Sequence, residues 1–530
     1  MDYTNGKIRQ IACLSLVGTA ALSLGACQEK KEETKPMNIL YIMCDDHSYQ
    51  TISAYDTRYI NTPNIDRIAA DGVRFTNSFV ANSISGPSRA CMLTGKHSLA
   101  NGFTDNSSEF DGSQQTFPKL LQAQGYETAV IGKWHLTSEP TGFNHWDILI
   151  GQGDYYNPTF ICNGQKVQRK GYATNVTTEL ALDWLENGRD ANKPFCLLLH
   201  HKAPHRTWMP DTCDLELFSD SNFPLPETFY DNYEGREAAL AQHMSISKDM
   251  DLVYDLKLAD KENEIHSRPD LEAAGRRIYS RMDSAQKAAW DAHYDRVIAE
   301  FKKKNPKGED LDAWKFQQYM RDYLRVITSV DRNIGQVLDY LETEGLMDNT
   351  LIVYTSDQGF YMGEHGWFDK RFMYEESFRT PLLMRLPGGV KGDITQLVQN
   401  IDYAPTILEA AGVEVPEDIH GCSLLPLLKG KEWSANRKAL YYHYYEFPDE
   451  HTVRPHLGVR TERYKLIRIV PTEFQGKQLQ GSWELFDLQE DPNELNNIYG
   501  KEGTEQLADS LKSLLKELQV QYGEEEYIEM

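Results

Sequence analysis

Residues 38–46 read Asn-Ile-Leu-Tyr-Ile-Met-Cys-Asp-Asp. The part from Asn38 to Met43 is almost wholly apolar, which is the pattern of a short strand buried on both faces of a sheet. Four more runs of this kind follow along the chain: Thr128 to Ile131, Phe195 to His200, Thr350 to Thr355 and Pro381 to Leu386. Helical patterns lie between them. We therefore expect an α/β fold in which helices cover both faces of a sheet of parallel strands.

The clearest helical pattern lies just before the Thr350 to Thr355 run. Apolar side chains recur there at three- and four-residue spacing from Tyr323 to Leu341, and the pattern ends near Gly345. Residues 225–320 are rich in charge, and we expect them to form a helical insertion at the surface.

The composition changes near residue 430. Strand-like segments follow at 439–446, 457–459, 464–469 and 483–487, and an amphipathic helix is expected over roughly 504–522. Short consecutive strands and one helix are typical of a small antiparallel domain. We expect a catalytic domain at 37–430 and a C-terminal subdomain at 431–530.

The first residues have the features of an export signal. Lys7 and Arg9 precede an apolar run that is too short for a comfortable membrane span. The run ends Leu24-Gly25-Ala26-Cys27, which resembles the lipobox of bacterial lipoproteins. We expect residues 1–27 to be a lipoprotein signal with Cys27 as the lipidated residue, and 28–36 to be a tether. The mature chain would be a cell-envelope protein, in the periplasm or at the cell surface, held to the membrane only by its lipid. An ordinary secretory signal with an incidental cysteine is the alternative.

Length and charge limit the classes of function. The chain has 530 residues, 40% of them hydrophobic, and a formal net charge of −24. These values suit a packed enzyme and argue against a partner that is a nucleic acid or an acidic membrane surface. A local cluster of cations could still hold a small anion.

Polar residues follow several of the expected strands, where the sites of open α/β sheets gather. Asp45-Asp46 follows the first strand, and Ser356-Asp357-Gln358-Gly359 follows the Thr350 to Thr355 strand. Three carboxylates and an amide oxygen form a hard donor set that suits Ca²⁺ or Mg²⁺. Helix capping or a solvated turn is the alternative for Asp45-Asp46 alone.

Cations and histidines occur in similar places. Gly132-Lys133-Trp134-His135-Leu136 follows the Thr128 to Ile131 strand, and Pro204-His205 follows the Phe195 to His200 strand. Lys370 stands further along the chain. Lysines can hold an oxyanion and histidines can move protons, although a lone histidine is more often a structural residue.

Residues 85–95 read Ser-Gly-Pro-Ser-Arg-Ala-Cys-Met-Leu-Thr-Gly. A turn leading into a helix would explain the small residues. The run also resembles the signature of the formylglycine-dependent type I sulfatases, in the form that begins with serine. The groups described above recur in that family's order, together with Thr62-Pro63-Asn64-Ile65-Asp66 and Glu484-Leu485-Phe486-Asp487-Leu488. The resemblance covers about residues 37–500. It implies an alkaline-phosphatase-like fold: a large mixed sheet flanked by helices, with a smaller C-terminal domain of antiparallel sheet plus helix.

The resemblance also implies cofactors. Ser85 would be oxidised to formylglycine by a serine-type radical maturase, and a hydroxyl of the hydrated aldehyde would attack sulfur. A Ca²⁺ ion would be held by Asp45, Asp46, Ser85, Asp357 and Gln358. Gln358 replaces an asparagine that is common in other branches, but it keeps the amide oxygen.

The remaining roles are carried over in the same way. Arg89 and Lys133 would steady the nucleophile, and Lys133 and Lys370 would neutralise the sulfate. His205 would protonate the leaving sugar oxygen, and His135 would take the proton that allows sulfate to leave.

Two segments resemble the branch that removes 6-sulfate from N-acetylglucosamine: residues 151–158, Gly-Gln-Gly-Asp-Tyr-Tyr-Asn-Pro, and residues 204–208, Pro-His-Arg-Thr-Trp. We therefore expect an exo-acting hydrolase of 6-sulfated residues in glycans of the heparan or mucin type. Arg454 and His456 are candidate sugar contacts, with a structural role as their alternative. Three other functions stay open: a sulfatase for 2-sulfated uronate or 6-sulfated galactose sugars, a phosphatase or phosphodiesterase of the same fold, and a non-catalytic glycan-binding lipoprotein.

Overall fold

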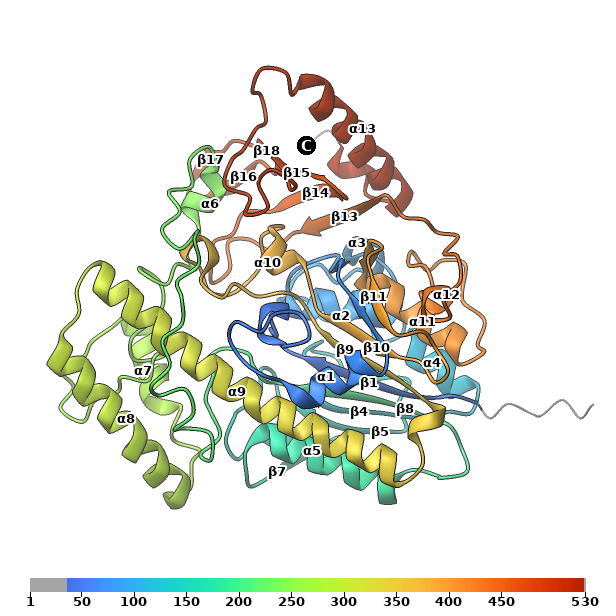
Figure 1. The fold of residues 1–530 in the computed structure, drawn as a ribbon, viewed down its shortest axis with the longest axis horizontal. Helices are drawn as coiled ribbons and strands as arrows, with labels where there is room; N and C mark the ends of the chain where they lie inside the picture. The colour runs from blue at the N-terminus through green and yellow to red at the C-terminus, as the bar shows by residue number, and fades with distance from the viewer. Residues whose placement is uncertain (1–35, 529–530) are drawn as a thin grey trace, which may run out of the picture. The chain divides into compact units, whose positions relative to one another are not determined.

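A ten-stranded mixed sheet forms the centre of the fold (Figure 1). The computed structural model describes residues 36–528, so the expected signal, lipobox and most of the tether lie outside the described residues. The strand order is β11-β2-β10-β9-β1-β8-β4-β5-β6-β7. The strands are β1 (Asn38–Cys44), β2 (Val73–Phe75), β4 (Glu127–Lys133), β5 (His145–Leu149), β6 (Thr159–Cys162), β7 (Gln165–Gln168), β8 (Phe195–His201), β9 (Thr350–Ser356), β10 (Leu382–Arg385) and β11 (Gly392–Ile394).

The strands β9, β1, β8 and β4 run parallel, as the apolar runs predict. β5, which the sequence analysis did not predict, runs parallel beside β4. The prediction was wrong for β10, which pairs antiparallel with β9 and begins with Leu382 opposite Thr355. The reason lies in the connection: residues 357–381 stay at the carboxyl end of β9, so the chain re-enters the sheet from that end. The outer strands β6 and β7 are also antiparallel.

Helices cover both faces of this sheet, and alternate residues of β1 show the division. Leu40 and Ile42 belong to a core shared with residues of α1 (Pro63–Ala70), α5 (Ala173–Asp183) and α9 (Glu309–Thr343). Ile39 and Tyr41 belong to a core on the other face, shared with α2 (Ser85–Thr94), α4 (Phe117–Ala123), α11 (Tyr403–Ala410) and α12 (Leu425–Leu428). A strand buried on both faces in this way explains the continuous apolar run. The two sets of helices lie on opposite sides of the sheet in Figure 1.

The expected helical insertion is helical only in part. It contains α6 (Glu237–Ala241), α7 (Pro269–Arg277), α8 (Ser284–Lys304) and the start of α9, and residues 242–268 contain no regular element. These residues still bury apolar side chains, among them Met250, Val253 and Leu256. The short α3 (Ser98–Asn101) and α10 (Glu375–Phe378) lie elsewhere in the fold. In the part of the chain from 36 to 528, no helix is both long and apolar enough to cross a membrane.

The C-terminal part is a four-stranded antiparallel sheet with one helix, as predicted. Its order is β13-β14-β15-β18, from β13 (Ala439–Tyr444), β14 (His456–Thr461), β15 (Tyr464–Ile469) and β18 (Ser482–Asp487). Helix α13 (Glu505–Tyr522) packs on one face of this sheet. The opposite face shares a core with the catalytic part, in which Tyr442 and Phe486 meet Trp367 and Tyr374. Two further strand pairs are small: β3 (Ser78–Phe79) with β12 (Val398–Gln399), and β16 (Thr472–Phe474) with β17 (Lys477–Leu479).

Candidate active site

Two neighbouring strands bring the predicted carboxylates together. Strands β1 and β9 are parallel, with Cys44 opposite Ser356, so the residues that follow them leave the sheet side by side. The backbone N–H of Asp46 donates to Oδ1 of Asp357 at 3.0 Å. All four predicted metal ligands from these strand ends, Asp45, Asp46, Asp357 and Gln358, are fully buried.

Helix α2 points its first turn at these carboxylates. Ser85 is its first residue, and its Oγ donates to Oδ1 of Asp45 at 3.2 Å. Arg89, one turn later on the same helix face, donates to Oδ2 of Asp357 from Nε at 3.2 Å and from Nη2 at 3.0 Å. Arg89 Nη1 also donates to the carbonyl of Lys133 at 2.8 Å, so one guanidinium ties α2 to β9 and β4.

Two lysines complete the centre of the site. Lys133 is the last residue of β4, and its ammonium pairs with Asp45 and also donates to Oε1 of Gln152 at 2.5 Å. The ammonium of Lys370 pairs with Asp46 and lies 3.4 Å from Oγ of Ser85. We call this group of side chains the polar cluster. Its members are Asp45, Asp46, Ser85, Arg89, Lys133, His205, Asp357, Gln358 and Lys370.

The two predicted histidines take different positions. Nε2 of His205 faces the polar cluster, 3.8 Å from Oδ2 of Asp46, while its Nδ1 lies 2.8 Å from the carbonyl of Arg206. Tyr155 holds the same segment, because its hydroxyl donates to the carbonyl of His205 at 2.6 Å. His135 lies further out, with its Nε2 3.2 Å from the amide nitrogen of Gln152. Its backbone has a positive φ of 56°, which is uncommon away from glycine.

Burial shifts the protonation of the cluster. It raises the pKa of Asp46 to about 6, although the Lys370 ammonium acts in the opposite direction. Burial also acts to raise the pKa of Asp357, but Arg89, Lys370 and Lys133 outweigh it and hold that pKa below its usual value. Burial, followed by the charge of the neighbouring lysines, lowers the pKa of His205. Burial and the neighbouring charges therefore favour the neutral imidazole of His205 and the ionised carboxylate of Asp357.

The donors fit a hard divalent cation. Oδ2 of Asp46 and Oε1 of Gln358 are buried and accept no hydrogen bond within the described chain, and buried acceptors without a partner are rare. Ligand atoms of Asp45, Asp46 and His205 also lie within 4.8 Å of one another. The amide nitrogen of Gln358 donates to Oδ1 of Asp46 and, at 2.8 Å, to Oδ1 of Asp357, and a half-turn of the amide would bring Oε1 to the same carboxylates. Carboxylate and amide oxygens suit Ca²⁺ or Mg²⁺ better than a thiophilic metal.

Arg454 and His456 do not join the polar cluster. The guanidinium of Arg454 donates to the carbonyls of Val470, Leu479 and Gln480. His456 is fully buried, and its Nε2 accepts the N–H of Met373 at 3.1 Å. These contacts are of the kind that a structural role requires, and the contact of the two residues with the sugar stays a prediction.

Sequence reasoning did not single out Gln152 and Lys202. Gln152 bridges Lys133 and His135 from the 151–158 segment. Lys202 directly follows β8, and its charge acts on both Lys133 and His205. The position of Lys202 at a strand end was a usable signal, but a single lysine there has no distinctive pattern.

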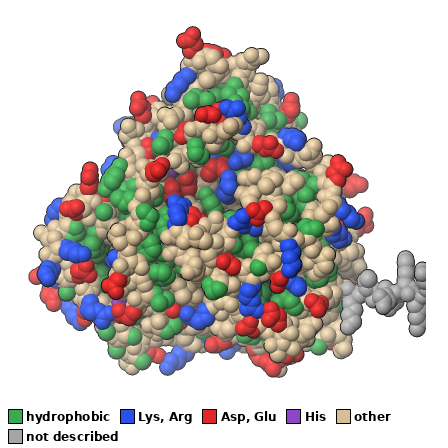
Figure 2. Space-filling model, in the orientation of Figure 1, with side chains coloured by type: hydrophobic (Ala, Val, Ile, Leu, Met, Phe, Trp, Pro, Cys, Tyr) green, Lys and Arg blue, Asp and Glu red, His purple; other side chains and the backbone are tan. Residues whose placement is uncertain are grey.

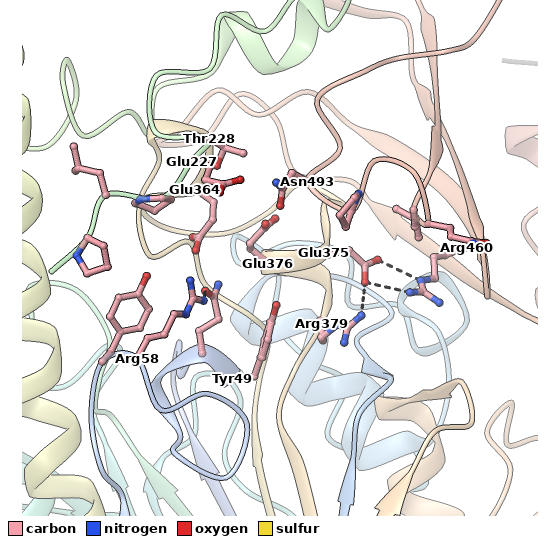
Figure 3. Close-up of a pocket in the computed structure, with 18 of the residues that line it drawn as sticks. Tyr49, Arg58, Glu227, Thr228, Glu364, Glu375, Glu376, Arg379, Arg460 and Asn493 are labelled. Carbon is pink, nitrogen blue, oxygen red and sulfur yellow. Dashed lines mark hydrogen bonds and ion pairs between the residues drawn. The ribbon is translucent and has the colours of Figure 1, made fainter.

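A separate cavity of about 800 Å³ opens on the face shown in Figure 2, between η1 (Tyr49–Thr51), α10 and the C-terminal sheet (Figure 3). Two of its four arginines are engaged by one carboxylate: Glu375 accepts from Arg379 at 2.7 Å and from Arg460 at 3.2 Å. None of the polar-cluster residues lines this cavity, so its size does not make it the active site.

Comparison with known proteins agrees with this geometry. A family model described as sulfatase matches residues 37–413, and one described as N-sulphoglucosamine sulphohydrolase, C-terminal, matches residues 363–521. The chain belongs to the sulfatase family. It is 51% identical to an N-acetylglucosamine-6-O-sulfatase of Bacteroides thetaiotaomicron over 516 residues, covering 96% of this chain and 90% of that protein. It is 25% identical to an ulvan-active sulfatase of Formosa agariphila, covering 98% of this chain and 89% of that protein. The solved structure of BT4656 in complex with its substrate D-glucosamine-2-N,6-O-disulfate superposes with a TM-score of 0.86 at 51% identity, covering 92% of this chain and 98% of that one.

Proposed function

We propose that this sulfatase hydrolyses the 6-O-sulfate of N-acetylglucosamine or glucosamine residues at the ends of sulfated glycans of the heparan or mucin type. The observation that carries the proposal is the polar cluster itself, within a chain that is 51% identical to an N-acetylglucosamine-6-O-sulfatase over nearly its whole length. The bound sugar in the BT4656 structure, a glucosamine with a 6-O-sulfate, belongs to the same class of substrate.

The chain's own residues would have three roles in this reaction. Lys133 and Lys370 supply positive charge where negative charge develops as the S–O bond breaks, in a buried site where such charges act strongly. Arg89 fixes the start of α2 against Asp357, which orients Ser85. His205 presents Nε2 toward the cluster and would give a proton to the leaving sugar oxygen. An arriving sulfo anion favours the imidazolium form of His205 and so prepares this step.

Two groups would complete this machinery. Formylglycine formed from Ser85 would supply a hydrated aldehyde as the nucleophile, and a serine-type radical maturase would make it. Ca²⁺ held by Asp45, Asp46, Asp357 and Gln358, with the residue at 85, would polarise the sulfo oxygens. We also propose that Cys27 carries the lipid of an envelope lipoprotein in the periplasm or at the cell surface.

The test is desulfation of a panel of sulfated mono- and disaccharides by protein co-expressed with a serine-type maturase. We expect release of sulfate from 6-sulfated N-acetylglucosamine and glucosamine, but not from 2-sulfated uronate or 6-sulfated galactose. The control is the Ser85→Ala variant, which keeps the rest of the cluster and should release nothing. Release only from a uronate or galactose sulfate would overturn the substrate. Equal release by Ser85→Ala would overturn the chemistry.

A further inference from the structure

Lys202 is a buried cation without an anionic partner. It follows β8 directly, and its side chain is only 5% exposed. Its ammonium lies 4.7 Å from the centroid of the Tyr155 ring, and within residues 36–528 it forms neither an ion pair nor a hydrogen bond with another side chain. A ring face replaces little of the hydration that an ammonium loses on burial, and Nζ still reaches solvent, so this position can take an anionic ligand from solution.

The other deeply buried lysines show what a satisfied ammonium looks like in this fold. Lys257 pairs with Asp322 at 2.9 Å, and Lys465 pairs with Glu494 at 2.7 Å. Lys315 donates to three backbone carbonyls, those of Ile246, Ser247 and Met250, at 2.9–3.1 Å. Lys202 differs from all of them.

The carboxylates whose charge reaches Lys202 are already used. Asp154 pairs with Arg281 at 3.0 Å, and Asp46 pairs with Lys370. Strand β8 lies between β1 and β4, and the N–H of Asp45 donates to the carbonyl of Ala203 at 3.3 Å, so Lys202 leaves the sheet between the strand ends that carry Asp45 and Lys133. The Tyr155 ring that its ammonium faces belongs to the tyrosine that holds the carbonyl of His205. Lys202 therefore adds a third ammonium to this edge of the sheet, and unlike Lys133 and Lys370 it has no carboxylate paired with it among the described residues.

We propose that Lys202 binds a sulfo group of the bound sugar, beside Lys133 and Lys370. The proposal rests on the proposed function for the identity of the sugar. The anion has two possible sources: the 6-O-sulfo group that is removed, or a second sulfo group on the same sugar. Lys202 is in either case a substrate contact, because its own charge meets the ligand directly.

The experiment uses protein made without the maturase, which keeps Ser85 and should bind substrate without turning it over. Lys202→Met removes the charge at nearly constant volume, and Lys202→Arg keeps it. Calorimetry in Ca²⁺-containing buffer would measure the binding of N-acetylglucosamine 6-sulfate, glucosamine-2-N,6-O-disulfate and inorganic sulfate. We expect Lys202→Met to weaken binding about tenfold or more and Lys202→Arg to stay within about threefold of the parent.

The two sugars distinguish the two sources. Weakened binding of the monosulfated sugar would assign the contact to the 6-O-sulfo group. A loss confined to the disulfated sugar would assign it to the second sulfo group. Unchanged binding of both sugars and of sulfate by Lys202→Met would overturn the proposal. If the parent binds sulfate but neither sugar, the proposed substrate fails, while the response of sulfate binding to Lys202→Met still decides the role of Lys202.

Thermal unfolding separates a ligand contact from a structural role. Lys202→Met removes a buried charge that lacks a partner, so its melting temperature should equal or exceed that of the parent. Lys315→Met is the matched control, because it removes a buried lysine whose three acceptors would be left unpaired, and it should lower the melting temperature. A clear fall in the melting temperature of Lys202→Met would show that the fold itself needs this ammonium, and would overturn the proposal.

Discussion

At the scale of single residues, Arg89 is the group that joins most parts of the site. Its two donors to Asp357 and its third to the carbonyl of Lys133 require the planar fork of a guanidinium. Arg89→Lys keeps the charge but can make only part of this set. We expect the matured variant to desulfate 6-sulfated N-acetylglucosamine about 100-fold more slowly or worse, a loss of the size seen when a reacting group is displaced by about 1 Å.

The control for Arg89→Lys is Arg74→Lys. Arg74 also makes a double contact with a carboxylate, to Asp393 at 2.9 and 2.6 Å, but at the outer edge of the sheet between β2 and β11. Its replacement should leave the initial rate of sulfate release unchanged. Equal rates for Arg89→Lys and the parent would show that the helix start is positioned without this guanidinium.

The same scale shows what the sequence could predict of the site. Asp45, Asp46, Ser85, Asp357 and Lys370 were predicted because they stand in motifs or directly after apolar strands, and the structure brings them together. Lys202 was missed for a physical reason. Lys202 stands out only because its ammonium has no anionic partner among the described residues. Whether a lysine has such a partner depends on residues far away in the chain. Arg454 could not be assigned from sequence for the same reason.

At the scale of elements, Gly132 controls how closely β4 approaches β8. Its φ is +110°, and a Cβ at this position would lie 1.9 Å from the carbonyl oxygen of His200. Gly132→Ala should push the two strands apart at the point where Lys133 leaves the sheet. We expect a loss of about 3 kcal/mol in the free energy of unfolding, measured by denaturant titration, together with weakened activity.

The matched control is Gly164→Ala, in the turn between β6 and β7. Gly164 also has a positive φ, of +88°, but open space surrounds the position of its Cβ. The Gly164→Ala variant should lose only about 1 kcal/mol in the free energy of unfolding, the cost of placing an alanine in a left-handed backbone conformation. Equal losses in the two variants would mean that the close approach to His200 is absorbed without cost.

Helices and strands were predicted best where burial on both faces requires a continuous apolar run. The five apolar runs coincide with β1, β4, β8, β9 and β10 to within three residues at either end, and the 464–469 strand coincides with β15. The direction of β10 could not be predicted, because a strand buried on both faces has the same apolar sequence pattern whether it runs parallel or antiparallel to its neighbour. Five strands of the large sheet were missed. β2 and β11 have three residues each, β7 is largely exposed, and β5 and β6 are buried only in part.

At the scale of the whole molecule, the packing of the C-terminal sheet onto the catalytic part buries carboxyl groups as well as apolar side chains. Glu484 of β18 is 2% exposed, and its Oε2 accepts the Tyr374 hydroxyl at 2.7 Å. Burial raises the pKa of Glu484 to about 7, and burial likewise raises that of neighbouring Glu494 to about 7. We therefore expect the stability of the shared core to depend on pH.

The sign of this dependence follows from proton binding. An unfolded glutamate has a pKa of 4.5, so between pH 4.5 and about 7 the native state holds a proton on Glu484 that the unfolded state has released. The free energy of unfolding should then fall as pH rises through this window, and the contribution should be fully present only below it. Glu484→Gln keeps a neutral group and should flatten the dependence, with a higher melting temperature than the parent at pH 8. Exposed Glu490→Gln is the control and should follow the parent. If Glu484→Gln and the parent lose stability in parallel from pH 5 to 8, the carboxyl group of Glu484 is already ionised in the folded protein and the core tolerates its charge.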